Sequence, residues 1–154
     1  MPEVTVTPET EARAMRIVAR AVRELGGAAQ MVRRHEQAML PALVESAYVL
    51  ILTEEQNCSV EEVARFLHVS RGAVESVIGA PTEMAIARLR DLNDPKAEFN
   101  WHDDPEWSDT PTTSRLEPAV LAGALAKFAY GIVQRESSHI EGTAQTRKDR
   151  GTIN

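Results

Sequence analysis

The 154-residue sequence lacks the features of membrane, secreted and β-rich proteins. Its longest unbroken apolar run, Ala47 to Leu52, is far shorter than the roughly 20 residues needed to cross a bilayer, so we expect no membrane span. The stretch from Met1 to Thr5 has no basic region followed by an apolar one, which predicts a cytoplasmic protein without a signal peptide. Aromatic residues make up only 5%, which argues against an all-β fold. Cys58 is the single cysteine, so no internal disulfide can form.

The sequence also lacks the patterns of catalytic and cofactor sites. None of the four histidines belongs to a recognisable catalytic motif, and there is no Walker loop or dinucleotide fingerprint. We therefore predict neither an enzyme nor a bound cofactor. Cys58 precedes a helix cap, where its pKa could be lowered, but a partly buried structural residue is the simpler interpretation. His102-Asp103-Asp104 and the pair His139 and Glu141 could ligate a metal, yet solvated polar residues explain them as well, so no metal site is predicted.

The net charge of -6 comes mostly from one segment. Residues 94–117 hold seven acids and two bases, which leaves the rest of the chain close to neutral at -1. Nucleic-acid binding depends on local basic surface, so the net charge does not exclude it.

With 43% hydrophobic and 26% charged residues, the chain is globular and long enough for one core. Helical spacing, caps and Pro or Gly boundaries predict an all-α helical bundle. The helix from Leu40 to Glu55 has little polar face and belongs in the centre of the core. The other predicted helices, apart from those of the motif below, are Pro8 to Leu25, Ala28 to about Met39, Glu83 to Leu92, and Pro118 to about Glu136.

The first predicted helix has two distinct faces. Its apolar stripe consists of Met15, Val18, Val22 and Leu25. Four arginines fall within an arc of about 80° on another side of the helix. A solvated helix face is the simpler interpretation, and the functional ones are a phosphate-contacting strip or a docking site for the acidic segment. These arginines are Arg13, Arg16, Arg20 and Arg23.

The segment from Ser59 to Ile78 has the pattern of a helix-turn-helix. Ser59 and Glu62 form an S-x-x-E capping box, and after Leu67 the chain must turn within about three or four residues. Ser70 can cap the second helix. The alternative is an ordinary helical hairpin in a bundle.

The N-terminal part of that second helix is the part that reads base edges in such a motif. We expect it to present Ser70, Arg71, Gly72, Glu75 and Ser76 outward. Two features depart from a usual DNA reader. His68 occupies the turn position that is usually glycine, and residues 59–92 have a net charge of -1.

The motif resembles the DNA-binding units of bacterial regulators and of sigma factor region four. A wider resemblance, over about half of the chain, is to a small family of regulatory domains encoded beside KaiC-like ATPases. The similar stretches are Leu40 to Tyr48, Glu54-Glu55, Ser59 to Val77, and Leu121 to Tyr130. This resemblance implies a role in regulation or signal transduction, with an ATPase as a genetic or physical partner.

These features predict four regions along the chain. Residues 1–92 form a helical domain with the helix-turn-helix at 59–78, and residues 93–117 form an acidic connection with three prolines and both tryptophans. Residues 118–136 form a packing or dimerisation helix rich in small side chains, and residues 137–154 form a flexible tail.

The favoured hypothesis is a transcriptional or signalling regulator that binds double-stranded DNA, as a homodimer reading two half-sites about one helical turn apart. Ser70, Arg71, Glu75 and Ser76 would face bases. Arg65 would contact phosphate together with some of the arginines of the first helix, which are Arg13, Arg16, Arg20 and Arg23. The alternative is a non-enzymatic interaction or dimerisation module in which the helix-turn-helix is purely structural. A third hypothesis joins the two: the acidic segment covers the arginines and competes with DNA.

Overall fold

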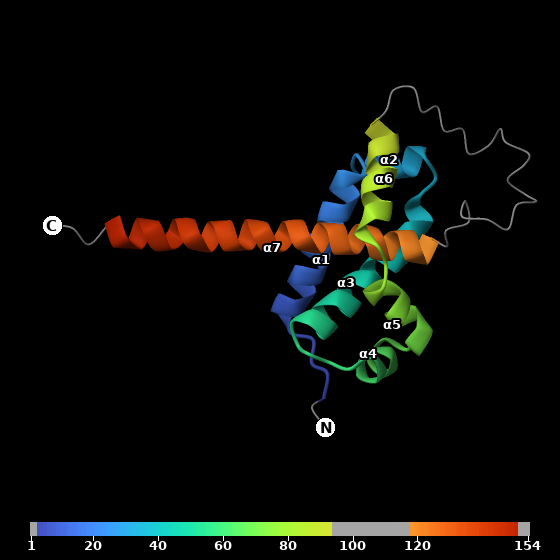
Figure 1. Cartoon of the computed structure of the whole chain (residues 1–154), viewed down its shortest axis with the longest axis horizontal. Coiled ribbons are helices and arrows are strands. Elements are labelled where there is room, and N and C mark those ends of the chain that lie inside the picture. Colours follow the sequence, from blue (N-terminus) through green and yellow to red (C-terminus); the bar gives the residue numbers. More distant parts are fainter. Residues whose placement is uncertain (1–2, 94–117, 151–154) are drawn as a thin grey trace, which may run out of the picture.

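The computed structural model describes residues 3–93 and 118–150. All regular elements within these residues are helical, which confirms the predicted all-α class (Figure 1). None of the described helices is long and apolar enough to span a bilayer. In chain order the helices are α1 (Pro8–Glu24), α2 (Ala28–Arg33), a 3-10 turn η1 (Gln37–Met39), α3 (Leu40–Glu54), α4 (Val60–Leu67), α5 (Arg71–Ile78), α6 (Thr82–Asn93) and α7 (Pro118–Arg150).

Helix α3 lies at the centre of the core, as its sequence predicts. It is in contact with α1, α4, α5 and α7. Its side chains are buried on most sides of the helix, which explains why so few of them are polar. The buried residues are Leu43, Ser46, Ala47, Val49, Leu50, Ile51 and Leu52.

Helix α7 packs its small side chains against α3, α1 and α6. Ala122, Ala126 and Ala129 are at most 1% exposed. A Cβ added at Gly123 would lie 3.3 Å from the Cβ of Ala80, so the helix approaches the turn after α5 closely. Of the two predicted roles for these small residues, packing and dimerisation, the structure shows packing within the chain.

The predicted end of this last helix, at about Glu136, is wrong. Helix α7 continues to Arg150 and extends beyond the rest of the described structure (Figure 1). The segment expected to be a flexible tail is therefore helical as far as Arg150. The physical reason is local: residues 137–150 contain one glycine and no proline, so nothing in them forces the helix to stop.

The buried face of α1 agrees with the predicted apolar stripe at Val18 and Leu25 but is rotated away from Met15. Met15, expected inward, is 50% exposed, whereas Ile17 is fully buried. Ala14 and Ala21 are also buried, because α3 and α7 pack against α1 where its side chains are small. A stripe chosen from large apolar residues alone missed these alanines.

The predicted helix from Ala28 to Met39 is interrupted after Arg33. His35 has a left-handed backbone with φ of 57°, and Glu36 turns inward to pair with Arg88 of α6. The resulting ion cluster overrides the helical tendency of the segment. This is a tertiary effect, which local sequence patterns do not report.

Glu36 is the acid of this mostly buried cluster. Its side chain is 8% exposed, and its Oε1 lies 2.6 Å from Nη2 of Arg88. Its Oε2 lies 3.5 Å from Nη1 of Arg34, whose Nη2 donates a hydrogen bond to the Leu25 carbonyl. The cluster therefore joins the end of α1, the segment after α2, and α6.

Replacing Glu36 by glutamine leaves Arg88 and Arg34 without a balancing charge in a mostly buried place. We expect Glu36→Gln to lower the free energy of unfolding by about 3 to 5 kcal/mol, as measured by urea denaturation. Glu24→Gln is the matched control, because its pair with Arg20 is partly exposed and should cost about 1 kcal/mol or less. A loss no larger than the control's would contradict a stabilising role for the cluster.

Candidate functional site

Helix α4 begins at the predicted capping box. The Glu62 amide donates to Oγ of Ser59 at 3.2 Å, and the Ser59 amide donates to Oε2 of Glu62 at 2.8 Å. Two backbone amides at the start of the helix, which have no partner within the helix itself, thus form hydrogen bonds. Val63 and Ala64 face the core and are buried. The small side chain of Ala64 lies on the buried side, as expected where two helices cross closely.

Three residues, His68 to Ser70, connect α4 to α5. His68 ends α4 in the left-handed region, with φ of 56°, which is the conformation that usually calls for glycine. The Val69 amide donates back to the Ala64 carbonyl at 3.0 Å. Ser70 then caps α5, because its Oγ accepts from the Ala73 amide at 3.0 Å. The predicted helices, turn and caps are all present at these residues.

The C-terminal half of α5 is fixed to the body. Val74 and Val77 are buried in the core. Nζ of Lys127 on α7 donates to the Ile78 carbonyl and, at 3.0 Å, to the Ala80 carbonyl. Since α5 is held at this end, its N-terminal part faces outward. The predicted outward residues, Ser70, Arg71, Gly72, Glu75 and Ser76, are all exposed.

Arg71, the only basic residue of α5, lies between two carboxylates. Its Nη1 is 2.7 Å from Oε1 of Glu61 on α4, and its Nε is 2.9 Å from Oε1 of Glu75. The hydrogen bond that Arg71 donates to Glu75 and the negative charges of Glu61 and Glu75 raise the pKa of Arg71. All three side chains are at least half exposed, so these pairs are easily exchanged with solvent. In the free protein this face carries no excess of positive charge.

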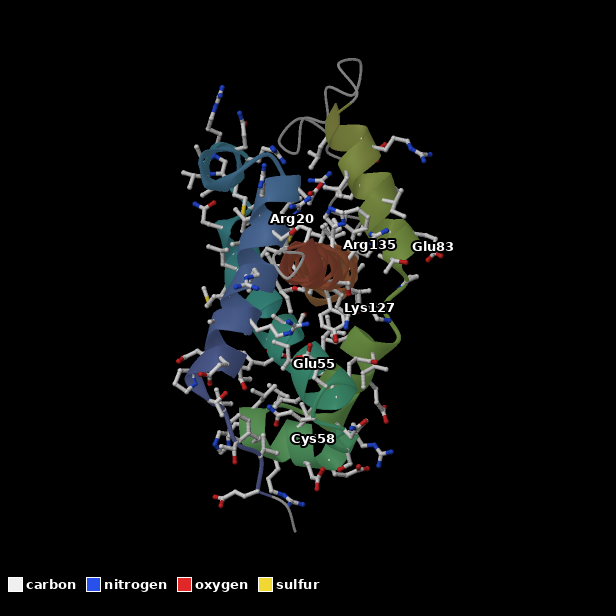
Figure 2. All side chains as sticks on the ribbon, turned by 90° about the vertical axis from the view of Figure 1, so that its left-hand side faces the viewer. Arg20, Glu55, Cys58, Glu83, Lys127 and Arg135 are labelled. Atoms are coloured by element: carbon white, nitrogen blue, oxygen red, sulfur yellow. The ribbon has the colours of Figure 1, made fainter. Side chains whose placement is uncertain are left out.

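The structure does not gather the arginines of α1 into one free strip. Arg13 pairs with Glu55 after α3 at 2.5 Å, and Arg20 pairs with Glu136 of α7 at 2.7 Å. Figure 2 shows Arg20 well away from Cys58, which lies just before α4. The remaining α1 arginines, Arg16 and Arg23, are exposed and form no ion pair with another described residue. Arg65, also predicted to contact phosphate, is exposed on α4.

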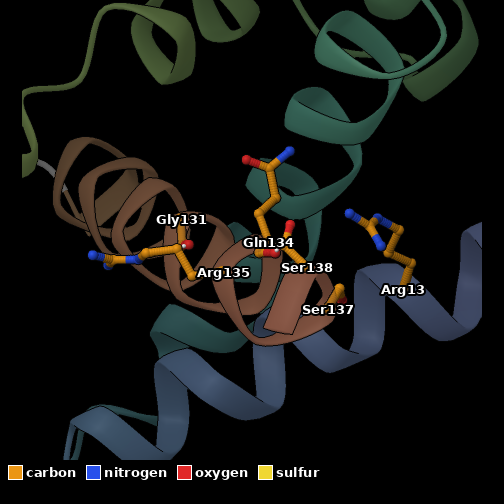
Figure 3. Close-up of a pocket in the computed structure, with 6 residues that line it drawn as sticks. All are labelled: Arg13, Gly131, Gln134, Arg135, Ser137 and Ser138. Atoms are coloured by element: carbon orange, nitrogen blue, oxygen red, sulfur yellow. Dashed lines mark hydrogen bonds between the residues drawn. The ribbon is translucent and has the colours of Figure 1, made fainter. Parts of the chain in front are cut away.

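Two hollows in the surface were not expected from the sequence. The larger, of about 580 Å³, is an open polar groove between α1 and α7 (Figure 3). Its two guanidinium groups already have partners, because Arg13 pairs with Glu55 and Nε of Arg135 donates to the Gly131 carbonyl at 3.2 Å. The second, of about 320 Å³, lies between α3 and α5. Each combines residues distant in the chain, so no local pattern could have found them.

The titratable groups near these sites favour structural roles. The Tyr130 phenol accepts a hydrogen bond from Nε2 of Gln134 at 2.8 Å and lies 3.5 Å from Oε1 of Glu55. Burial and the nearby negative charge of Glu55 raise the pKa of Tyr130, so it stays a neutral phenol at physiological pH. Burial and Glu62 likewise raise the pKa of the Cys58 thiol, which disfavours a reactive thiolate.

No group of three or more potential metal-ligating side chains occurs in the part of the chain that the structure describes. His102-Asp103-Asp104 and the acidic segment 94–117 lie outside the described residues.

Comparison of the chain with protein-family models, curated proteins and solved structures yields no match. The resemblance to domains encoded beside KaiC-like ATPases therefore stays a prediction.

We expect His68→Gly to stabilise the protein, because glycine adopts the left-handed conformation without steric strain. The gain in free energy of unfolding should be on the order of 0.5 to 1 kcal/mol, since the more flexible unfolded chain offsets part of the relief. Asn57→Gly is the control: Asn57 has φ of 54°, and asparagine tolerates this region better, so its gain should be smaller. Destabilisation by His68→Gly, in thermal or urea unfolding, would show that the imidazole itself stabilises the turn.

Proposed function

We propose that the protein is a DNA-binding transcriptional or signalling regulator in which α4 and α5 act as a helix-turn-helix. One observation supports this most: α5 is buried and tied down at its C-terminal end while its N-terminal part, directly after a three-residue turn, is exposed. In helix-turn-helix proteins this part of the second helix enters the major groove.

The exposed side chains supply suitable chemistry for reading base edges. Arg71 can bond to O6 and N7 of guanine, and Glu75 can accept from N4 of cytosine. The hydroxyls of Ser70 and Ser76 can bond to either kind of edge, and Arg65 can contact phosphate. To reach a base, Arg71 would leave its exposed ion pairs, each worth about 1 kcal/mol or less.

Phosphate contacts from α1 belong to the same proposal, with a changed set of residues. Arg16 and Arg23 are the candidates, since Arg13 and Arg20 form ion pairs within the bundle. The proposal also includes a cytoplasmic homodimer that reads two half-sites. It further includes a KaiC-like ATPase as a partner, and this part of the proposal rests on the resemblance alone.

A second candidate function is a protein-interaction module in a signalling system. The position of Arg71 between Glu61 and Glu75 favours it, because an acidic surface repels phosphate. Residues 59–92 as a whole have a net charge of -1. Phe66 on α4 is 39% exposed and would offer a partner an apolar side chain. The partner would then be a protein with a basic docking face.

The two functions are separated by enriching random duplex DNA on the purified protein and measuring affinity at low and high salt. For the DNA reader we expect a consensus sequence whose affinity falls as salt rises. Arg71→Ala should weaken binding to it by about 1 to 3 kcal/mol. Glu61→Gln, which removes one of the two acids that hold Arg71, should strengthen binding.

Arg33→Ala is the matched control, because Arg33 is an exposed arginine on α2 and no part of the proposed DNA face. Its effect should be small compared with that of Arg71→Ala. Failure to enrich any sequence would contradict DNA reading and favour the interaction module. Equal affinities for Arg71→Ala and the unchanged protein would show that Arg71 is not part of the interface.

A further inference from the structure

We propose that the hollow between α3 and α5 binds a small aliphatic primary amine in its protonated form. This cavity, of about 320 Å³, lies beside the first turns of α5 and the beginning of α7. It is more enclosed than the groove of Figure 3 and is lined by both polar and apolar side chains. The proposal is independent of DNA binding.

Ser46 on α3 is the buried polar group of this cavity. It is 2% exposed and yet lines the cavity. Other hydroxyls within helices, those of Thr53, Ser76 and Ser138, donate to the carbonyl one turn back at 2.7, 2.8 and 3.0 Å. The Ser46 hydroxyl forms no hydrogen bond with another described residue. Because Ser46 lines the cavity, a ligand atom there can form the hydrogen bond that this hydroxyl lacks within the described residues.

Glu45 gives the cavity its charge. Its side chain is half-buried, and it forms no ion pair within residues 3–93 and 118–150. By contrast, the nearby acids Glu61 and Glu75 pair with Arg71. No lysine or arginine is among the described residues that line the cavity. The charge therefore selects a cation and disfavours carboxylates and phosphates.

The remaining lining matches an ammonium group on a short hydrocarbon chain. An ammonium has three N–H donors, for which the Glu45 carboxylate and the hydroxyl oxygens of Ser46 and Ser76 are acceptors. Ser76 donates its own proton to the Gly72 carbonyl, which leaves its oxygen able to accept. The cavity also has apolar lining residues, which suit methylene groups. These residues are Ala42, Ala73, Val77 and Val120.

The volume limits the size of the ligand. At about 320 Å³ the cavity lies at the lower end of the range for small-molecule sites, which is roughly 300 to 1,000 Å³. This favours an amine with a short chain over a nucleotide or a large aromatic compound. The probe of choice is n-butylamine, with butyrate and 1-butanol as an anion and a neutral compound of the same chain length.

The experiment titrates each probe into the isotope-labelled full-length protein and follows the backbone amide resonances at constant pH. We expect saturable shifts of residues 45–46 and 72–77 with n-butylamine. Affinity for 1-butanol should be weaker by about tenfold or more, and butyrate should not bind, because only the amine pairs with Glu45. Absence of saturable shifts with the amine at these residues would overturn the proposal.

Variants identify the groups that hold the amine. Glu45→Gln should weaken binding by about tenfold or more, and Ser46→Ala by about fivefold. Glu83→Gln removes an exposed acid elsewhere, on α6, and should leave the affinity unchanged. Unchanged affinity in both Glu45→Gln and Ser46→Ala, with a normal unfolding transition, would overturn the proposed site. A negative result in the DNA experiment has no bearing on either outcome.

Discussion

The close approach of α7 to α3 and to the turn after α5 is the packing constraint on which the rest of the structure depends. Gly123 leaves space for Ala80, and Ala126 and Ala129 are buried without crowding the neighbouring helices. The same helix provides Lys127, which holds the carbonyls at the end of α5. A larger residue at Gly123 would separate these elements, since well-packed cores do not absorb added volume without strain.

This constraint determines which part of α5 is available for function. Because α7 and the core hold its C-terminal half, the exposed part begins at Ser70 and includes Arg71 and Glu75. The proposed amine cavity shares Ser70 and Ser76 with the proposed DNA-reading face. A ligand in the cavity would therefore lie directly beside the side chains that face DNA, which is where a small-molecule signal could change recognition.

Local sequence signals predicted much of the fold and part of the candidate site. The caps at Ser59 and Ser70, and the left-handed turn at His68, depend on residues within one helical turn of one another, so they could be predicted. The ion pairs of Arg71 and Arg20 with acids on other helices could not be predicted from local sequence. The cavity beside Ser46 could not be predicted either. These features depend on how distant helices pack. Their residues, considered singly, look like ordinary surface or core positions.

Native-state hydrogen exchange tests most directly the claim that α7 is part of the core that supports α5. We expect that amides in residues 124–133 of α7 and 47–52 of α3 exchange with the same high free energy, equal to that of global unfolding, because the two helices form one cooperative unit. Markedly faster exchange in α7, with α3 still fully protected, would contradict the account. In that case α7 would open on its own, and α5 would not depend on it.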